Sequence, residues 1–258
     1  MFRITKDNHN ILQGVAKPDK TLDEDHIHQL DEFVEQNVER YWIKKGGPLV
    51  KPEEGGAHII IVDDPQMPKL VQIAKQIAPN RPVIFRSHIQ VRADLADEDD
   101  TATAGVWKWV WERIQQTDVF VSHPVREFVP KNVDTAKVGY MPATTDWLDG
   151  LNKPLDDWDN RYYLHEFDVD VHHKEENPLQ VLDGREYFVQ IARFDPAKGI
   201  PDLLAAYAEF RRAYLKDVVD KKRIPQLVVA GHSAIDDPDA VEIYDLTKEL
   251  LDTEYADV

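Results

Sequence analysis

Short apolar segments rich in β-branched residues recur along the chain and predict buried strands. They are continuously apolar rather than alternating, which is typical of strands covered on both faces of a sheet. These strands are expected at 57–62, 82–85, 119–122, 137–141, 187–194 and 227–230. Longer segments between them have helical character, and helices are expected at 24–45, 68–78, 101–116, 201–216 and 238–252. Alternating strands and helices predict an α/β protein with parallel, doubly wound sheets.

The alternation stops between Met141 and Glu186, where Pro, Asp, Asn, Tyr and Trp dominate. We therefore expect an amino-terminal Rossmann-like domain at 1–145, an inter-domain linker at 146–185 and the start of a second Rossmann-like domain at 186–258. The second part holds only two predicted strands, whereas doubly wound domains usually have five or six. The opening strand of the first part is also weak. Both domains are thus expected to be incomplete, in a segment of a longer protein.

The charge balance narrows the classes of function. The 258 residues include 31 Lys and Arg against 48 Asp and Glu, a net charge of −17. Such a surface repels polyanions, which argues against a nucleic acid or an anionic membrane as partner. The absence of cysteine excludes disulfides, thiolate zinc sites and cysteine nucleophiles. No apolar run approaches the about 20 residues of a membrane helix, and the charged start is unlike a signal peptide, so a cytoplasmic protein is expected.

Ligands of open parallel sheets bind beyond the carboxyl ends of the strands, so residues at those ends are the candidates for chemistry. Arg193 and Lys198 bracket an Asp-Pro turn, and Gly199 then opens a helix whose free N–H groups favour an anion. Two cations at a helix start make a phosphate site plausible. The alternative is that Arg193 pairs with Asp195 while Lys198 is solvated, and spacing alone leaves both interpretations open.

Asp64 and His88 follow neighbouring predicted strands, 24 positions apart with a helix between them. An imidazole at that edge could hydrogen-bond a sugar hydroxyl or polarise a developing charge, and a carboxylate could orient hydroxyls. The structural alternative is a histidine that satisfies local hydrogen bonds and an aspartate that forms a turn before Pro65.

Other features point less directly to chemistry. His165, His172 and His173 lack the carboxylate spacing of a metal site, so no metal is expected. The tryptophans at 107, 109 and 111 cannot all face the core of one helix, and helix packing or a contact surface would account for them. The chain contains no GxGxxG, GxxxxGK[ST] or GxSxG motif, which removes support for dinucleotide, P-loop and α/β-hydrolase functions.

Several segments, taken in order, resemble one known family. They are FRITK at 2–6, HNILQG at 9–14, VDDPQMPKLV at 62–71, RPVIFRSHIQVRADL at 81–95, VFVSHPVREFVP at 119–130, VGYMPATTDWLDGLNK at 138–153 and VQIARFDPAKGIPDLL at 189–204. Together they resemble the retaining trehalose phosphorylase and trehalose synthase group, within family 4 of the glycosyltransferases of GT-B fold. The RFDPAKG segment is shared across the whole glycosyltransferase family, whereas HNILQG, DDPQ and RSHIQVRADL are narrower, and their joint presence in this order is specific.

The resemblance implies roles for individual residues. In that family the cleft between two Rossmann-like domains binds a glucosyl donor, and by position Arg193 and Lys198, with Gly199, would hold its phosphate. His88 would lie beside the transferred sugar, and Asp64 near the sugar hydroxyls. The residues implied on the acceptor side are Lys6, His9, Asn10, Gln13, Gln66 and Arg86.

The reaction implied by the resemblance is reversible phosphorolysis of α,α-trehalose to glucose and α-glucose 1-phosphate with retained configuration, without a cofactor. A nucleotide-sugar-dependent trehalose synthase is the nearest alternative, and a noncatalytic fragment is another. The family's paired glutamates, spaced eight apart in the carboxy-terminal domain, have no counterpart before Val258. The isolated chain is therefore expected to be inactive. A homodimer is expected because family members are often oligomeric.

Overall fold

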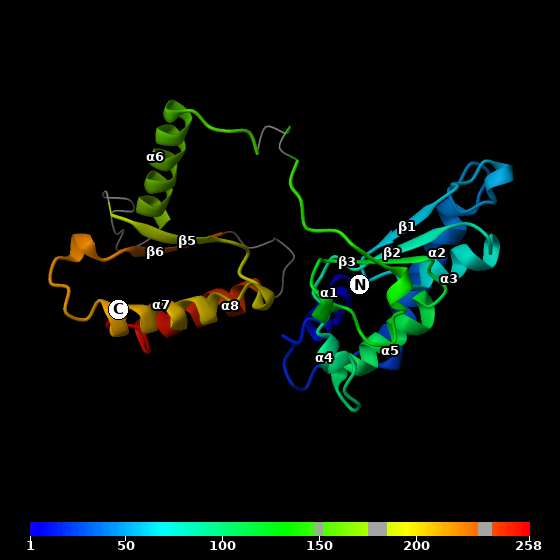
Figure 1. Ribbon diagram of the computed structural model, residues 1–258, viewed down its shortest axis with the longest axis horizontal. Coiled ribbons are helices and arrows are strands. Elements are labelled where there is room, and N and C mark those ends of the chain that lie inside the picture. Colours follow the sequence, from blue (N-terminus) through cyan, green and yellow to red (C-terminus); the bar gives the residue numbers. More distant parts are fainter. Residues whose placement is uncertain (147, 149–151, 175–184, 232–238) are drawn as a thin grey trace. The chain divides into compact units, whose positions relative to one another are not determined.

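The computed structural model describes residues 1–146, 148, 152–174, 185–231 and 239–258. It divides the chain into two compact units, Met1–Ala143 and Thr144–Val258, and each is described by itself (Figure 1). No helix in the described ranges is long and apolar enough to cross a membrane.

A parallel four-stranded sheet forms the centre of the first unit. Its strands β1 (Ile60–Asp63), β2 (Val83–Arg86), β3 (Val119–Ser122) and β4 (Val138–Tyr140) lie in the order β1-β2-β3-β4. All four predicted strands are confirmed, with ends shifted by up to three residues. The register pairs Asp63 with Arg86 at the ends of β1 and β2, so the residues that follow these strands lie at one edge of the sheet.

Five α-helices accompany this sheet: α1 (Phe2–Leu12), α2 (Glu24–Asn37), α3 (Lys69–Ile77), α4 (Ala93–Ala96) and α5 (Ala102–Ile114). Asp23 caps α2 and Thr101 caps α5, each by accepting a backbone N–H of the first turn. Helix α1 was not among the helices expected from the sequence. The burial of Lys6, Asn8 and Asn10 on α1 explains the failure, because polar residues on the inner side hide the apolar periodicity.

Helices cover one face of this sheet, whereas the sequence predicted cover on both. Ile60 and Val62 of β1 are buried, but Ile61 between them is 65% exposed. The strand order accounts for this burial pattern. Successive parallel strands joined by right-handed crossovers place every connecting helix on the same face, and a doubly wound sheet is covered on both faces only where the order reverses.

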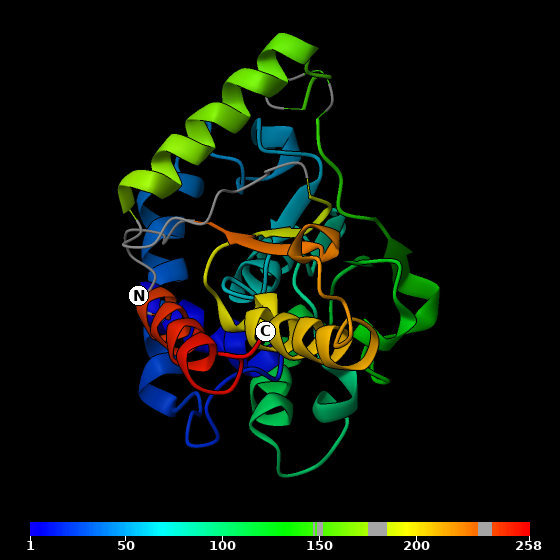
Figure 2. The same ribbon diagram turned by 90° about the vertical axis from the view of Figure 1, so that its left-hand side faces the viewer.

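The second unit contains a parallel pair of strands, β5 (Tyr187–Ile191) and β6 (Gln226–Ala230). Helices α7 (Ile200–Tyr214) and α8 (Ala240–Asp252) pack against each other, and Figures 1 and 2 show both on the same side of the strand pair. A small apolar core joins these elements. Its buried members are Phe194, Ile200, Ala240 and Ile243.

Helix α6 (Asp157–Lys174) lies inside the segment expected to be an inter-domain linker. This helix was not predicted because its apolar residues do not gather on one side. Trp158 and Tyr162 are largely exposed and stack on each other with ring centroids 5.5 Å apart. The predicted linker therefore contains regular structure that local aromatic stacking helps to hold.

Candidate functional site

Asp64 occupies the turn directly after β1 and has an unusual backbone. Its φ angle is 86°, in the left-handed region that residues other than glycine seldom adopt, and it is only 4% exposed. The Asp64 N–H donates to the carbonyl of Arg86 at 2.8 Å, which holds the turn against the end of β2. Strained conformations of this kind persist where the surrounding structure imposes them, and they cluster at functional sites.

His9 of α1 faces the Asp64 carboxylate. His9 Nε2 lies 2.9 Å from Asp64 Oδ1, and both atoms are buried without an aligned hydrogen bond to any described residue. Asn8, which is fully buried, fixes α1 in this place because its Nδ2 donates to the carbonyl of Pro65 at 3.2 Å. The helix that sequence analysis missed thus brings an imidazole onto the candidate carboxylate.

His88 approaches the same carboxylate from the segment after β2. Its Nε2 lies 3.7 Å from Asp64 Oδ2, beyond hydrogen-bond range, and its Nδ1 lies 3.2 Å from Asp63 Oδ1. His123, just after β3, bonds through Nε2 to the backbone carbonyl of His88 at 2.7 Å. Three consecutive strand ends therefore contribute to one cluster of ionisable side chains.

The remaining residues predicted on the acceptor side differ in their exposure and contacts. Arg86 donates to Asp63 Oδ2 at 2.8 Å, so its guanidinium is engaged within the sheet edge. Lys6 and Asn10 are buried on α1, Gln13 is half-buried at the end of α1, and Gln66 is half-buried in the turn after β1. The structure connects His9, Asp64, His88 and Arg86 directly or through Asp63.

The candidate phosphate residues belong to the second unit. Gly199 has a φ of 62° and caps the start of α7, and Lys198 immediately before it is exposed. An Arg193 guanidinium nitrogen lies 3.5 Å from Asp195 Oδ2, while Asp195 Oδ1 accepts the N–H of Ala197 at 2.9 Å. The Arg193–Asp195 contact and the exposed Lys198 match the alternative interpretation of this segment, and the Gly199 turn at the start of α7 is the feature that the phosphate interpretation requires.

Three residues that contact the site were not predicted from the sequence: Asp63, Asn8 and His123. Asp63 carried a usable signal, because it ends β1 opposite Arg86, and such cross-strand neighbours of opposite charge interact. Asn8 carried none, since its burial depends on where α1 packs.

The weaker candidates are also placed by the structure. Trp107 and Trp109 are buried in the core of the first unit and Trp111 is half-buried, which confirms helix packing. His165 and His173 are exposed on α6. Within the described residues, no group of three or more His, Asp or Glu is placed to hold a metal ion.

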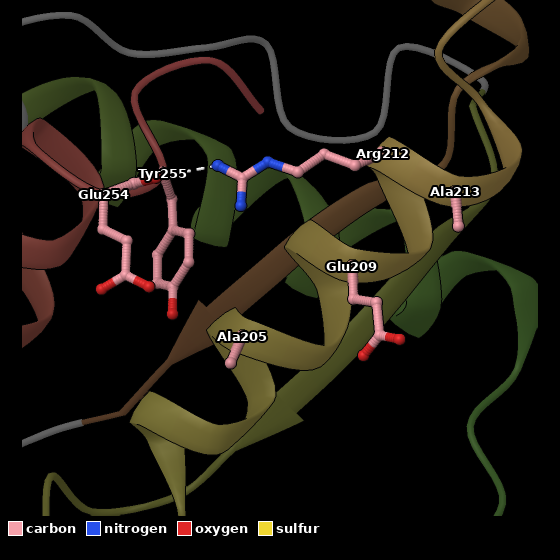
Figure 3. Close-up of a pocket in the computed structure, with 6 residues that line it drawn as sticks. All are labelled: Ala205, Glu209, Arg212, Ala213, Glu254 and Tyr255. Atoms are coloured by element: carbon pink, nitrogen blue, oxygen red, sulfur yellow. Dashed lines mark hydrogen bonds between the residues drawn. The ribbon is translucent and has the colours of Figure 1, made fainter.

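A shallow hollow of about 440 Å³ lies beside α7 and the turn that follows α8 (Figure 3). Arg212 closes one side of it by donating to the carbonyl of Glu254 at 2.8 Å and to the Asp257 carboxylate. Its lining residues are Ala205, Glu209, Arg212, Ala213, Glu254 and Tyr255. None of them belongs to the predicted site.

A parallel α/β sheet with its ionisable side chains gathered beyond the strand ends is the arrangement of Rossmann-like ligand-binding domains. Residues 1–130, half of the chain, match the model of the trehalose synthase N-terminal domain family. The chain belongs to this family, whose fold is that of the GT-B glycosyltransferases.

Similar curated proteins carry two names. Trehalose phosphorylases of Grifola frondosa and Pleurotus pulmonarius are 46% and 44% identical to the chain, over 99% and 98% of its length. A trehalose synthase of Thermococcus litoralis is 27% identical over 98% of the chain. The chain spans about a third of the length of the two phosphorylases, 34% in each case, and 51% of the synthase.

Proposed function

We propose that the protein containing this chain is a retaining glycosyltransferase that catalyses reversible phosphorolysis of α,α-trehalose to glucose and α-glucose 1-phosphate. The structural observation that carries the proposal is the buried, left-handed Asp64, with one imidazole 2.9 Å from its first oxygen and a second 3.7 Å from its other oxygen. Such a cluster offers donors and acceptors to sugar hydroxyls at the edge where parallel sheets bind ligands.

The difference in sequence identity favours phosphorolysis over synthesis from a nucleotide sugar. Identity is 42–46% to the curated trehalose phosphorylases and 25–27% to the trehalose synthases, over 92–99% of the chain in every case. The greater identity to the phosphorylases supports inorganic phosphate as the co-substrate.

In the first unit, His88 and Asp64 are assigned to the sugar that is transferred and to its hydroxyls. His9 would share the Asp64 carboxylate with the acceptor sugar, and Lys6, Asn10, Gln13, Gln66 and Arg86 would line the acceptor side. Neutral imidazole can both donate and accept hydrogen bonds, while an ionised carboxylate only accepts. The pair therefore suits a ligand that presents several hydroxyl groups.

In the second unit, Arg193 and Lys198 are assigned to the phosphate, with Gly199 admitting it to the start of α7. The left-handed Gly199 has no side chain to block a helix start whose N–H groups and dipole favour anions. Asp202 in the first turn of α7 adds a negative charge there, so both cations are needed to favour phosphate.

Bond making and breaking balance without a cofactor. A phosphate oxygen forms the bond to the anomeric carbon on the face from which the acceptor glucose leaves. The glycosidic oxygen departs with a proton taken from phosphate, and glucose is released. The charge on the phosphate changes as its oxygen bonds to the anomeric carbon, and Arg193 and Lys198 would stabilise that charge by electrostatic preorganisation.

The proposal is tested by assaying the complete protein with trehalose and phosphate, and separately with glucose and UDP-glucose or ADP-glucose. Phosphorolysis predicts glucose 1-phosphate in the first assay, and a His88→Ala variant should lose it while a variant of the exposed His173 keeps it. Trehalose formed only from a nucleotide sugar would contradict the proposal and support a trehalose synthase, the name that the matching family model carries. Lack of activity in both assays would support a noncatalytic role.

A further inference from the structure

Asp63 uses both carboxylate oxygens to connect two side chains at the sheet edge. Its Oδ2 accepts a hydrogen bond from Arg86 Nη1 at 2.8 Å, and its Oδ1 lies 3.2 Å from His88 Nδ1. The Asp63 side chain is 48% exposed, so it is not needed to fill the core. Its position at the end of β1, in register with Arg86, places it beside His88.

The chemistry of these groups fixes where the ring proton lies. A carboxylate can only accept hydrogen bonds, so His88 Nδ1 must be the donor in this contact. In the neutral ring the other nitrogen, Nε2, is then the acceptor, and it lies toward Asp64. His123 Nε2 bonds to the backbone carbonyl of His88 at 2.7 Å, which restrains the backbone of this residue.

We propose that Asp63 is a positioning residue that fixes the tautomer of His88, with hydrogen on Nδ1 and a free acceptor at Nε2. The expected effect of Asp63 on catalysis rests on the proposed function, because Asp63 acts through His88. Arg86 contributes by fixing the orientation of Asp63.

The role of Arg86 gives an unusual expected result for Asp63→Asn. A guanidinium has donors only, so the asparagine oxygen must face Arg86 and its NH₂ group must face His88. His88 Nδ1 then becomes the acceptor, and the hydrogen moves to Nε2. One nearly isosteric substitution should thus invert the tautomer, whereas Asp63→Glu, which keeps a carboxylate, should retain the original one.

The test is nitrogen NMR of the 258-residue chain labelled at histidine, recorded at an alkaline pH at which the ring nitrogen signals no longer change with pH. The proposal predicts a protonated Nδ1 for His88 in the unsubstituted chain and in Asp63→Glu, and a protonated Nε2 in Asp63→Asn. Adding Arg86→Met to Asp63→Asn should remove the preference, since the amide is then free to turn over.

The chain offers a matched control. His26 Nδ1 lies 3.1 Å from Asp23 Oδ1, with side-chain exposures of 38% and 59%, close to the 40% and 48% of His88 and Asp63. Asp23→Asn should leave the His88 signals unchanged, which separates a local effect from a general one. Backbone amide spectra of each variant show whether the fold is kept.

A protonated Nε2 in the unsubstituted chain, or an unchanged tautomer in folded Asp63→Asn, would overturn the proposal. Steady-state kinetics of the complete protein then test its consequence separately. An inverted tautomer in a serine protease triad lowers turnover by about 10⁴-fold, and a loss of kcat of this kind with little change in KM is expected here. Inversion of the tautomer with unchanged kcat would leave the positioning role intact and contradict the proposed role of His88.

Discussion

Replacing Asp64 with glycine separates the cost of this residue to the fold from its value to the site. The backbone at Asp64 has a φ of 86°, and its carboxylate is buried. Glycine adopts this conformation without strain and also removes the carboxylate that His9 and His88 face. Removing a side chain that is needed for structure should lower the free energy of unfolding. Removing one that is needed only for chemistry should leave the free energy of unfolding nearly unchanged.

The expected change in the free energy of unfolding is small. A strained left-handed backbone costs at least about 1 kcal/mol, which glycine relieves, while the greater freedom of glycine in the unfolded chain returns up to about 1 kcal/mol. The contact between His9 and Asp64 is not an aligned hydrogen bond, so its loss costs no more than about 1 kcal/mol. Asp64→Gly should therefore unfold within about 1 kcal/mol of the unsubstituted chain.

Urea unfolding followed by tryptophan fluorescence measures this change, because Trp107 and Trp109 lie in the core of the same unit. Asp100→Gly is the control for strain alone, since Asp100 has a φ of 65° in an exposed loop. Asp31→Ala is the control for a structural carboxylate.

Asp31 is 8% exposed and accepts three hydrogen bonds from Arg113, and breaking such a buried pair costs about 3–5 kcal/mol. A loss as large as this in Asp64→Gly would refute the reasoning and make Asp64 a structural residue. A small loss, combined with inactivity of the complete protein, is the expected outcome.

Three further predictions concern other parts of the chain. In the complete protein, Arg193→Ala and Lys198→Ala should each lower the rate of phosphorolysis by about 10²–10³-fold while the fold stays intact. Stopped assays measure the rate and circular dichroism checks the fold, and unchanged rates would exclude the phosphate assignment. Arg81→Met should destabilise the first unit by about 3 kcal/mol or more in urea, since the buried guanidinium donates to five backbone carbonyls; a loss below about 1 kcal/mol would contradict this. Burial raises the pKa of Asp118, but hydrogen bonds from Lys75 and a backbone N–H outweigh burial and lower the pKa overall. The ionised Asp118 therefore stabilises the folded chain above about pH 4, and this contribution is lost as the pH falls further. Asp118→Asn should flatten the acid side of the urea midpoint profile, and an unchanged profile would count against the assignment.

Elements of the fold with a strong local pattern were predictable, and elements that depend on packing were not. Strand β3 was predicted at its observed bounds because a short apolar run between polar turns has few alternatives. Helix α1 was missed because it buries lysine and asparagine, whose burial is favourable only when partners supplied by tertiary structure satisfy them. The helical segment expected to reach residue 45 instead ends as α2 at Asn37 and continues in a π-helical turn to Trp42.

The sequence pointed to Asp64 and His88 as candidate site residues but did not predict how they contact other side chains. Position after a strand was enough to select Asp64 and His88, because the carboxyl edge of a parallel sheet is where ligands bind. The left-handed φ of Asp64 and the contact with His9 depend on the turn and on α1, and neither has a signature at the level of single residues. Asp63 was overlooked because its role appears only once β1 and β2 are aligned in register.

The candidate residues of the two units need different experiments to test them. The contacts of Asp64 and His88 with His9, Asp63 and His123 lie within the unit Met1–Ala143, so the tautomer and these contacts can be measured on that unit. The phosphate assignment to Arg193 and Lys198 concerns charge that develops during reaction, so only the rate in the complete protein reports it. A failure of the first set of measurements would therefore count against the geometry, and a failure of the second would count against the proposed reaction.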